Sequence, residues 1–115
     1  MREIKFRRPI LKEKEFYRYE YWGVNLSGAL FLSPSSDGVY GSDEQFTGLS
    51  DKNGKDIYEG DVVTNVKFKD GSDYNNVNLH IYYENAHFGV GMANLSDVKE
   101  LEVIGSMYEN PDLIQ

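Results

Sequence analysis

Cysteine is absent from this chain of 115 residues. Disulfides, thiolate metal sites and thiol nucleophiles are therefore excluded, and the absence fits a reducing compartment. No apolar run approaches the roughly 20 residues that a membrane-spanning helix needs. The N-terminal stretch MREIKFRRPI has no long apolar segment behind it, unlike a signal peptide. We therefore expect an intracellular protein without a membrane partner.

Helical patterns are scarce as well. Only NLSDVKEL (94–101) looks helical, for one or two turns, with Ser96 as a candidate N-cap. Period-two alternation dominates instead, as in FYRYEYW (16–22), which reads as a half-buried strand. We predict a mainly β fold of small antiparallel sheets with at most one short helix. The expected strands are 4–7, 16–22, 28–32, 61–69, 77–83, 87–93 and 101–105, with a loop over 33–44.

Positive charge is scarce beyond residue 20. Residues 1–20 hold seven Lys or Arg against four Glu, and the remainder holds five against fifteen acidic residues, which together give −7. Such a basic arm either binds an anionic partner or lies on acidic residues of its own chain or a neighbour. Charge balance favours the second interpretation. Nucleic acid is not an expected partner, because the acidic body would repel phosphates.

The centre of the chain, QFTGLSDKNGKDIYEGDVV (45–63), is dense in turn residues. Asn53 and Gly54 predict a type I′ hairpin turn, which requires positive φ at both positions. Gly60 lies in a second tight turn, where we expect a backbone angle that a β-carbon would forbid. With Gly48, these residues predict the repeated reversals of a small barrel.

Three segments in order, MREIKFR, QFTGLSDKNGKDIYEGDVV and VIGSMYENPDLI (103–114), resemble the YopX family of phages and prophages of Gram-positive bacteria. The chain departs from the family pattern over residues 8–44. The resemblance implies a C-terminal SH3-like barrel, a homo-oligomer and no established activity. We accordingly divide the chain into an N-terminal β segment (1–44) and a barrel with a C-terminal tail (45–115) in one compact unit, placed in the cytoplasm of the bacterial host.

The sequence gives little support for a metal site or a catalytic site. Asp56, Glu59 and Asp61 could ligate a hard cation, but turn chemistry is the favoured interpretation, so no metal is expected. His80 and His87 lie seven residues apart and match no zinc spacing. No cofactor and no enzymatic activity are expected. A metal-dependent hydrolase using the carboxylates around Glu59 remains an alternative.

Aromatic residues alternate with arginines in the basic arm. They could stack on the ring of a nucleotide, or they could pack in the core or at an interface with another subunit. Packing is the favoured interpretation. We predict an accessory protein of a phage or prophage that self-assembles and binds a host factor, or sequesters a small nucleotide-like ligand from the host. Nucleic-acid binding through the basic aromatic arm is a further alternative. The candidate ligand residues are Arg7, Arg8, Tyr17, Arg18, Tyr19 and Trp22, and the candidate structural turns are Gly48, Asn53, Gly54 and Gly60.

Overall fold

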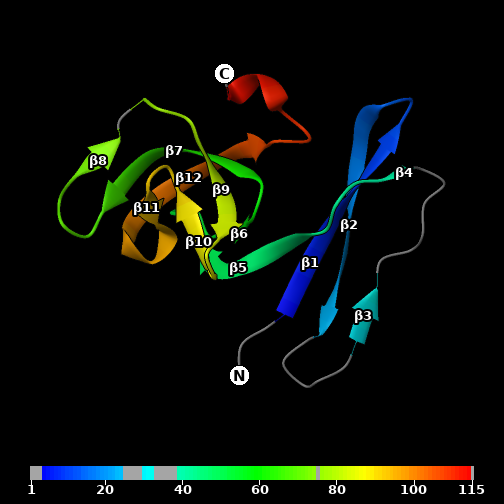
Figure 1. Ribbon diagram of the computed structural model, residues 1–115, viewed down its shortest axis with the longest axis horizontal. Coiled ribbons are helices and arrows are strands. Elements are labelled where there is room, and N and C mark those ends of the chain that lie inside the picture. The colour runs from blue at the N-terminus through cyan, green and yellow to red at the C-terminus, as the bar shows by residue number, and fades with distance from the viewer. Residues whose placement is uncertain (1–3, 25–29, 33–38, 75, 115) are drawn as a thin grey trace.

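The computed structural model describes residues 4–24, 30–32, 39–74 and 76–114, and strands dominate them (Figure 1). These residues contain no α-helix, and no helix among them is long and apolar enough to cross a bilayer. The mainly β prediction is confirmed. The elements are β1 (Ile4–Lys12), β2 (Glu15–Val24), β3 (Leu30–Leu32), β4 (Val39–Tyr40), β5 (Glu44–Ser50), β6 (Asp56–Tyr58), β7 (Asp61–Phe68), β8 (Asp73–Tyr74), β9 (Leu79–Glu84), β10 (His87–Val90), β11 (Ala93–Asn94), the 3-10 turn η1 (Leu95–Asp97), β12 (Val98–Ser106) and the 3-10 turn η2 (Pro111–Leu113).

The strands form two curled antiparallel sheets, in keeping with a small β-barrel fold (Figure 1). The first sheet has the order β3-β2-β1-β5-β6, and β4 also pairs with β1. The second has the order β11-β10-β9-β7-β12, and β8 also pairs with β7. Strand β5 pairs with β1 at Glu44 and Gln45 and with β6 from Phe46 onward. The first sheet therefore runs across the boundary that we drew between residues 44 and 45.

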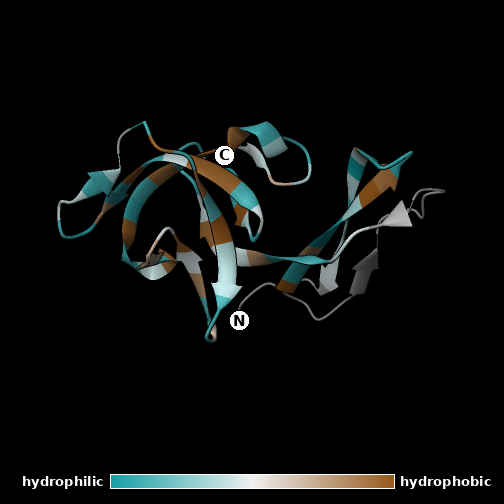
Figure 2. Ribbon diagram, turned by 45° about the horizontal axis from the view of Figure 1, so that its top comes forward, coloured by the Kyte–Doolittle hydropathy of each residue, from teal (hydrophilic) through white to brown (hydrophobic). Residues whose placement is uncertain are grey.

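One hydrophobic cluster fills the curled C-terminal part of the chain, which we call the barrel (residues 45–106). Figure 2 shows hydrophobic residues recurring along the strands of the second sheet. The β1–β2 hairpin lies outside this cluster and projects from the barrel (Figure 1). The barrel therefore has a core of its own, and other contacts must fix the hairpin to it. The cluster consists of Ile57, Val63, Val66, Phe68, Ile81, Val90, Leu95, Leu101 and Val103.

The helix predicted over 94–101 is wrong. A single 3-10 turn forms there, and it is Asn94 rather than Ser96 that caps it, by accepting a hydrogen bond from the backbone N–H of Ser96 at 3.0 Å. From Val98 onward the chain is strand β12, which pairs with β7 and buries Leu101 in the core. Pairing and burial across the sheet outweigh the local helical preference of this short segment.

The type I′ turn predicted at Asn53-Gly54 is also wrong. Gly54 has a φ of 83°, but Asn53 is not among the residues with positive φ. The N–H of Gly54 donates to the carbonyl of Asp51 at 3.0 Å, and the left-handed glycine follows this turn. Such an arrangement matches the three-residue hairpin loop, which needs one left-handed residue rather than two.

The aromatic face predicted for residues 16–22 is more exposed than expected. Glu20 is buried in β2, whereas Tyr17 and Tyr21 are exposed. The register shifts between Ile10 and Leu11 of β1, which leaves Tyr17 without a partner in the β1–β2 ladder. A bulge of this kind turns the side chains beyond it toward a different face.

Candidate functional site at the hairpin–barrel junction

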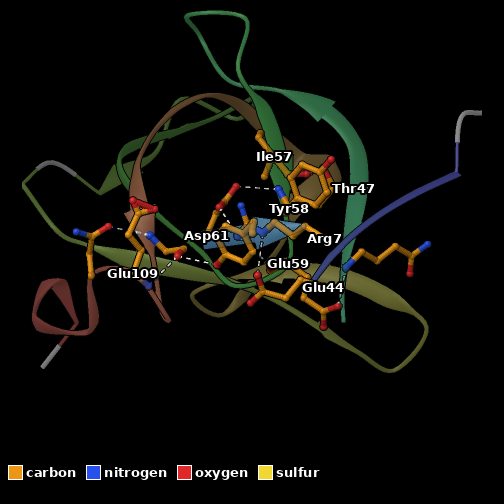
Figure 3. A network of polar contacts seen from close by, with 12 residues as sticks. Arg7, Glu44, Thr47, Ile57, Tyr58, Glu59, Asp61 and Glu109 are labelled. Atoms are coloured by element: carbon orange, nitrogen blue, oxygen red, sulfur yellow. Dashed lines mark hydrogen bonds and ion pairs between the residues drawn. The ribbon is translucent and has the colours of Figure 1, made fainter. Parts of the chain in front are cut away.

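The register of the β1–β2 hairpin decides which side chains meet the barrel. Arg7 of β1 is paired with Tyr21 of β2, and directly paired residues in a sheet share a face. Tyr19 lies on that face as well, and its hydroxyl donates to Ser106 Oγ of the barrel at 2.8 Å. This face of the hairpin therefore packs on the barrel, and the junction between them holds the polar network of Figure 3.

Arg7 is the centre of this network and is only 5% exposed. Its Nε donates to Glu44 Oε1 at 2.8 Å, and its Nη2 donates to Asp61 Oδ1 at 2.7 Å (Figure 3). The guanidinium also lies over the rings of Tyr19 and Tyr58, at 4.2 and 4.7 Å from their centroids. Planar stacking together with fixed hydrogen bonds is a role that arginine fills and lysine does not.

The first residue of β7 is one of the two acidic partners of Arg7. Asp61 is 1% exposed, and its Oδ2 accepts the backbone N–H of Tyr58 at 2.8 Å. Gly60 has a φ of 88°, and a β-carbon at this position would overlap the carboxylate of Glu44. Glycine is thus required twice, once for the backbone angle and once for the space that Glu44 occupies.

Two carboxylates and one guanidinium leave this buried cluster with a formal charge of −1. Burial raises the pKa of Glu44 and of Asp61, and the charge of Arg7 only partly opposes the shift. Burial would lower the pKa of Arg7, but Asp61 and the other groups around it raise it overall. Burial also raises the pKa of Tyr58 to about 12, so this phenol keeps its proton at neutral pH.

An open depression of about 410 Å³ lies beside the network, bordered by β1, β2 and the β6 segment. Lys5 forms an ion pair with Asp56 at 2.5 Å, and its ammonium also lies 4.2 Å from the ring centroid of Phe46. The ring of Tyr21, whose side chain is 43% exposed, meets the ring of Tyr58 edge-on at 5.9 Å. The depression combines ammonium groups with phenol rings. Its lining residues are Lys5, Arg7, Tyr21, Lys55, Asp56 and Tyr58.

The structure separates the six candidate ligand residues. Arg7 and Tyr19 lie on the barrel side of the hairpin, whereas the register places Arg8 and Trp22 on the opposite face. There the Nε of Arg8 and the Nε1 of Trp22 both donate to Asp43, at 3.0 and 3.3 Å. Of the six, Arg7 is the one that lines the depression.

Two further candidates lie near the bulged end of the hairpin. The ammonium of Lys12 lies 3.9 Å from the ring centroid of Tyr17. Arg18 donates to Glu20 at 2.9 Å on the face opposite the barrel. The lining residues that the sequence interpretation missed are Lys5, Lys55 and Tyr58. The i, i+2 spacing of Lys5 and Arg7 could have identified the first of them, whereas Lys55 and Tyr58 needed the fold. Tyr21 belongs to the aromatic stretch 16–22 considered for stacking, but it was not one of the six candidates.

The basic arm lies on acidic residues of its own chain, which was the favoured interpretation. Lys5, Arg7 and Arg8 all form ion pairs with carboxylates from residues 43–61. Asp56 and Asp61 are two of these partners, and Glu59 accepts the backbone N–H of Gln45 at 3.0 Å. The acidic group of 56–61 therefore serves turns and ion pairs. In the part of the chain that the structure describes, no three His, Asp or Glu side chains are arranged to hold a metal.

The two histidines belong to neighbouring strands of the second sheet. His80 is exposed on β9, where its ring lies 5.8 Å from that of Tyr82. His87 begins β10, and its Nδ1 lies 3.3 Å from the carbonyl oxygen of Asn85. Neither residue lines the depression at the junction.

Comparisons with known proteins agree with this architecture. The family model described as YopX protein matches residues 13–115. The match includes most of the stretch 8–44 that we treated as divergent, and it leaves out the opening MREIKFR. A search of curated proteins found no match. The crystal structure of protein EF1440 from Enterococcus faecalis is similar over 100% of both chains, with a TM-score of 0.63 and 23% identity. At that identity the similarity concerns the fold.

Proposed function

Because the chain belongs to the YopX family, we propose that it is an accessory protein of a phage or prophage that acts by binding and not by catalysis. Its ligand is a small nucleotide-like anion of the host cytoplasm, which an oligomer of this chain sequesters. The observation that carries the proposal is the depression at the junction, where basic side chains and tyrosines converge in an acidic protein of net charge −7.

The first step is the recognition of phosphate. Lys5 and Lys55 border the depression with Arg7. Hydrogen bonds from ammonium groups to phosphate oxygens are charge-assisted and are about twice as strong as neutral ones. Arg7 is held in place by Glu44 and Asp61, so this side of the depression needs no reorganisation when a ligand enters.

The second step is the recognition of a ring. Tyr21 is half-exposed, and its edge contact with Tyr58 limits the freedom of its ring. Stacking of a base on an aromatic side chain contributes about 1–3 kcal/mol. The phenol of Tyr58 stays protonated well above neutral pH and can donate a hydrogen bond. A ligand with a phosphate and an aromatic ring fits both halves of the depression.

Asp56 regulates the affinity in this proposal. Its carboxylate holds the ammonium of Lys5 at 2.5 Å, so an anionic ligand must compete with it. The side chains of Lys5 and Asp56 are 18% and 41% exposed, so water reaches the carboxylate more than the ammonium. An ion pair open to solvent on one side is weaker than a fully buried one. A phosphate carrying two charges can therefore displace it.

Self-assembly is the second part of the proposal. It places half-exposed apolar side chains of the hairpin at the contact between copies, since aromatic and apolar side chains are typical of interface cores. Ile4 and Tyr17 lie at the two ends of the hairpin and are 50% and 52% exposed. Native mass spectrometry of the full chain should show a defined oligomer, and a monomer at micromolar concentration would contradict this part.

Calorimetric titration with AMP, ADP and cyclic dinucleotides, with adenosine as the phosphate-free control, tests the ligand. We expect binding of at least one phosphate-bearing ligand, and Lys5→Met should weaken it about 10-fold to 100-fold, through the loss of a charge-assisted hydrogen bond. Asp56→Asn should tighten it, because the competing carboxylate is gone. Lys67→Met on β7, whose ammonium lies 3.9 Å from Glu100, is the matched control and should have no effect.

The proposal fails if no member of the panel binds at millimolar concentration. It also fails if Lys5→Met and Lys67→Met bind the ligand equally well. Equal affinity for AMP and adenosine would remove phosphate recognition and leave only the aromatic part of the site.

A further inference from the structure

A second groove, of about 580 Å³, lies between β5 and the β9–β10 hairpin, and its lining is separate from that of the depression at the junction. It is larger than the depression at the junction, and residues Thr47 and Leu49 of β5 form one wall. Tyr83 and Phe88 of the β9–β10 hairpin line it as well, together with Leu95 and Ser96 of η1. None of these residues lines the depression around Arg7.

The lining of this groove carries no lysine, arginine, aspartate or glutamate in eleven residues. Charged residues make up 27% of the chain, so about three would be expected in a set of eleven. Depletion of charge together with aromatic side chains is the compositional signal of an interface core. A lining of this kind offers no formal opposite charge to a charged ligand from lysine, arginine, aspartate or glutamate.

The apolar anchors of the groove are exposed. Leu49 is 45% exposed and Tyr83 is 51% exposed, although both are large and hydrophobic. Phe88 lies beside Tyr83 on the same face of the sheet, since the two residues are directly paired between β10 and β9, and their rings meet edge-to-face at 5.0 Å. A ring held in this way loses little freedom when a partner packs against it.

Strand β5 also offers backbone to this groove. Strand β1 pairs with β5 at Glu44 and Gln45, and pairing with β6 is irregular between Phe46 and Ser50. Gly48 lies in that interval with a φ of 87°, which marks a bulge. Between Phe46 and Ser50, no described strand pairs with β5 on the side away from β6. The N–H of Leu49 donates to Thr47 Oγ1 at 3.2 Å, so an added strand would pair with the other backbone groups of this interval.

We propose that this groove binds an extended, uncharged peptide segment of a protein partner, with an apolar side chain seated between Leu49 and Tyr83. The volume lies in the range of sites for drug-sized ligands, of about 300–1,000 Å³. Eleven residues line the groove, whereas each side of a stable dimer contact typically involves about 20–30 residues. A short peptide therefore fits the groove better than a broad face of a second copy. The inference rests on the binding role proposed above and concerns its protein target, through residues that the nucleotide-like ligand does not touch.

Fluorescence anisotropy with labelled eight-residue peptides tests this inference on the full chain. The probes have neutral ends and alternate leucine or valine with threonine, and the matched probes carry aspartate in place of threonine. We expect the neutral peptides to bind and the aspartate peptides to bind at least about tenfold weaker, since each buried unpaired charge is costly. Amide NMR shifts on binding should map to Leu49 and to Phe88.

Leu49→Asp should weaken binding of the neutral peptides at least about tenfold, by placing a charge in the contact. Tyr83→Ser provides a second variant without added charge, and Ile104→Asp on β12 is the control, because Ile104 is exposed outside the groove. Circular dichroism should show all three variants folded. The inference is overturned if no neutral peptide binds, or if Leu49→Asp and Ile104→Asp behave alike.

Two outcomes separate this inference from the proposed function. If Leu49→Asp reduces the size of the oligomer while no peptide binds, the groove is a contact between copies and the peptide is refuted. If Lys5→Met leaves nucleotide binding unchanged while the neutral peptides bind, the small-ligand proposal fails and the peptide groove stands.

Discussion

Replacing Arg7 by methionine tests whether the buried ion network holds the hairpin on the barrel. Methionine keeps the length and much of the apolar volume of the side chain but removes the charge and its donors. Glu44 and Asp61 then remain buried without their cation, at 6% and 1% exposure. Removing one partner of a buried ion pair costs about 3–5 kcal/mol. Since small domains are stable by only about 5–15 kcal/mol, the loss should be large.

The pH dependence of this loss follows from the direction of the pKa shifts. Burial raises the pKa of Glu44 and Asp61 even with Arg7 present, and without Arg7 both values should rise further. A group whose pKa is raised in the folded state stabilises the protein fully below its unfolded pKa, and this contribution is lost as the pH rises through the folded value. The penalty of Arg7→Met should therefore be small near pH 4 and reach its full size by pH 7.

Urea unfolding followed by fluorescence and by circular dichroism measures both effects. The single tryptophan, Trp22, lies in the hairpin and stacks on Phe6 at 4.5 Å, so its fluorescence reports on this element. Arg8→Met is the matched control on the same strand, because the pair of Arg8 with Asp43 is about one-third exposed. Such a pair contributes at most about 1 kcal/mol. Equal losses for the two variants at pH 7, or a loss for Arg7→Met that does not shrink at low pH, would refute the reasoning.

Three further variants test the turns and the phenols. Asp51→Ala should cost about 2–4 kcal/mol in urea unfolding, because its carboxylate accepts three backbone N–H groups, one of them from β12; Asp70→Ala, in an exposed turn, should cost clearly less. Gly60→Ala should lower the melting temperature far more than Gly71→Ala, since both have positive φ but only Gly60 lacks space for a β-carbon. Burial raises the pKa of Tyr58 to about 12, so the stability that its protonated phenol contributes is lost as pH rises from 10 toward that value. Tyr58→Phe should therefore lose less stability between pH 10 and pH 12 than the unchanged protein, as measured by circular dichroism. An equal loss in both proteins would contradict this.

Local patterns were sufficient for several of the strands and turns, but not for β5 and β6, which lie in the stretch that we interpreted as turns. The strands predicted over 61–69 and 77–83 correspond to β7 and β9, which pair antiparallel as expected. Apolar and polar residues alternate along these segments, and no segment shows the apolar spacing of a helix, so a strand is the structure that this pattern predicts. The predicted strand 28–32 and loop 33–44 lie partly outside the described residues, and β4 and the start of β5 occupy the described end of that loop.

The same patterns failed where the residues of one segment are compatible with two backbone conformations. Residues 94–101 satisfy the rules for a short helix, yet the chain from Val98 onward pairs with β7 and forms strand β12. Asn53-Gly54 satisfies the rule for a type I′ turn, but the carboxylate of Asp51 accepts the N–H groups of Asn53 and Lys55 and favours a different loop. In both places long-range or side-chain hydrogen bonds outweigh an intrinsic preference of about 1 kcal/mol or less.

By itself the sequence determined the β class, the reversals at Gly54 and Gly60, and the family, because these depend on residue type and near neighbours. It also located the acidic and basic residues that form the network, without their partners. The turn predicted at Gly48 is wrong: Gly48 lies inside β5, where its φ of 87° marks a bulge in the strand. Tertiary structure alone decided that Arg7 meets Glu44 and Asp61, and that Lys55 and Tyr58 join Lys5 beside it. These contacts join residues 37 to 54 positions apart. Such distances are closed only by the register of β1 on β5 and by the curl of the sheet, which no local pattern encodes.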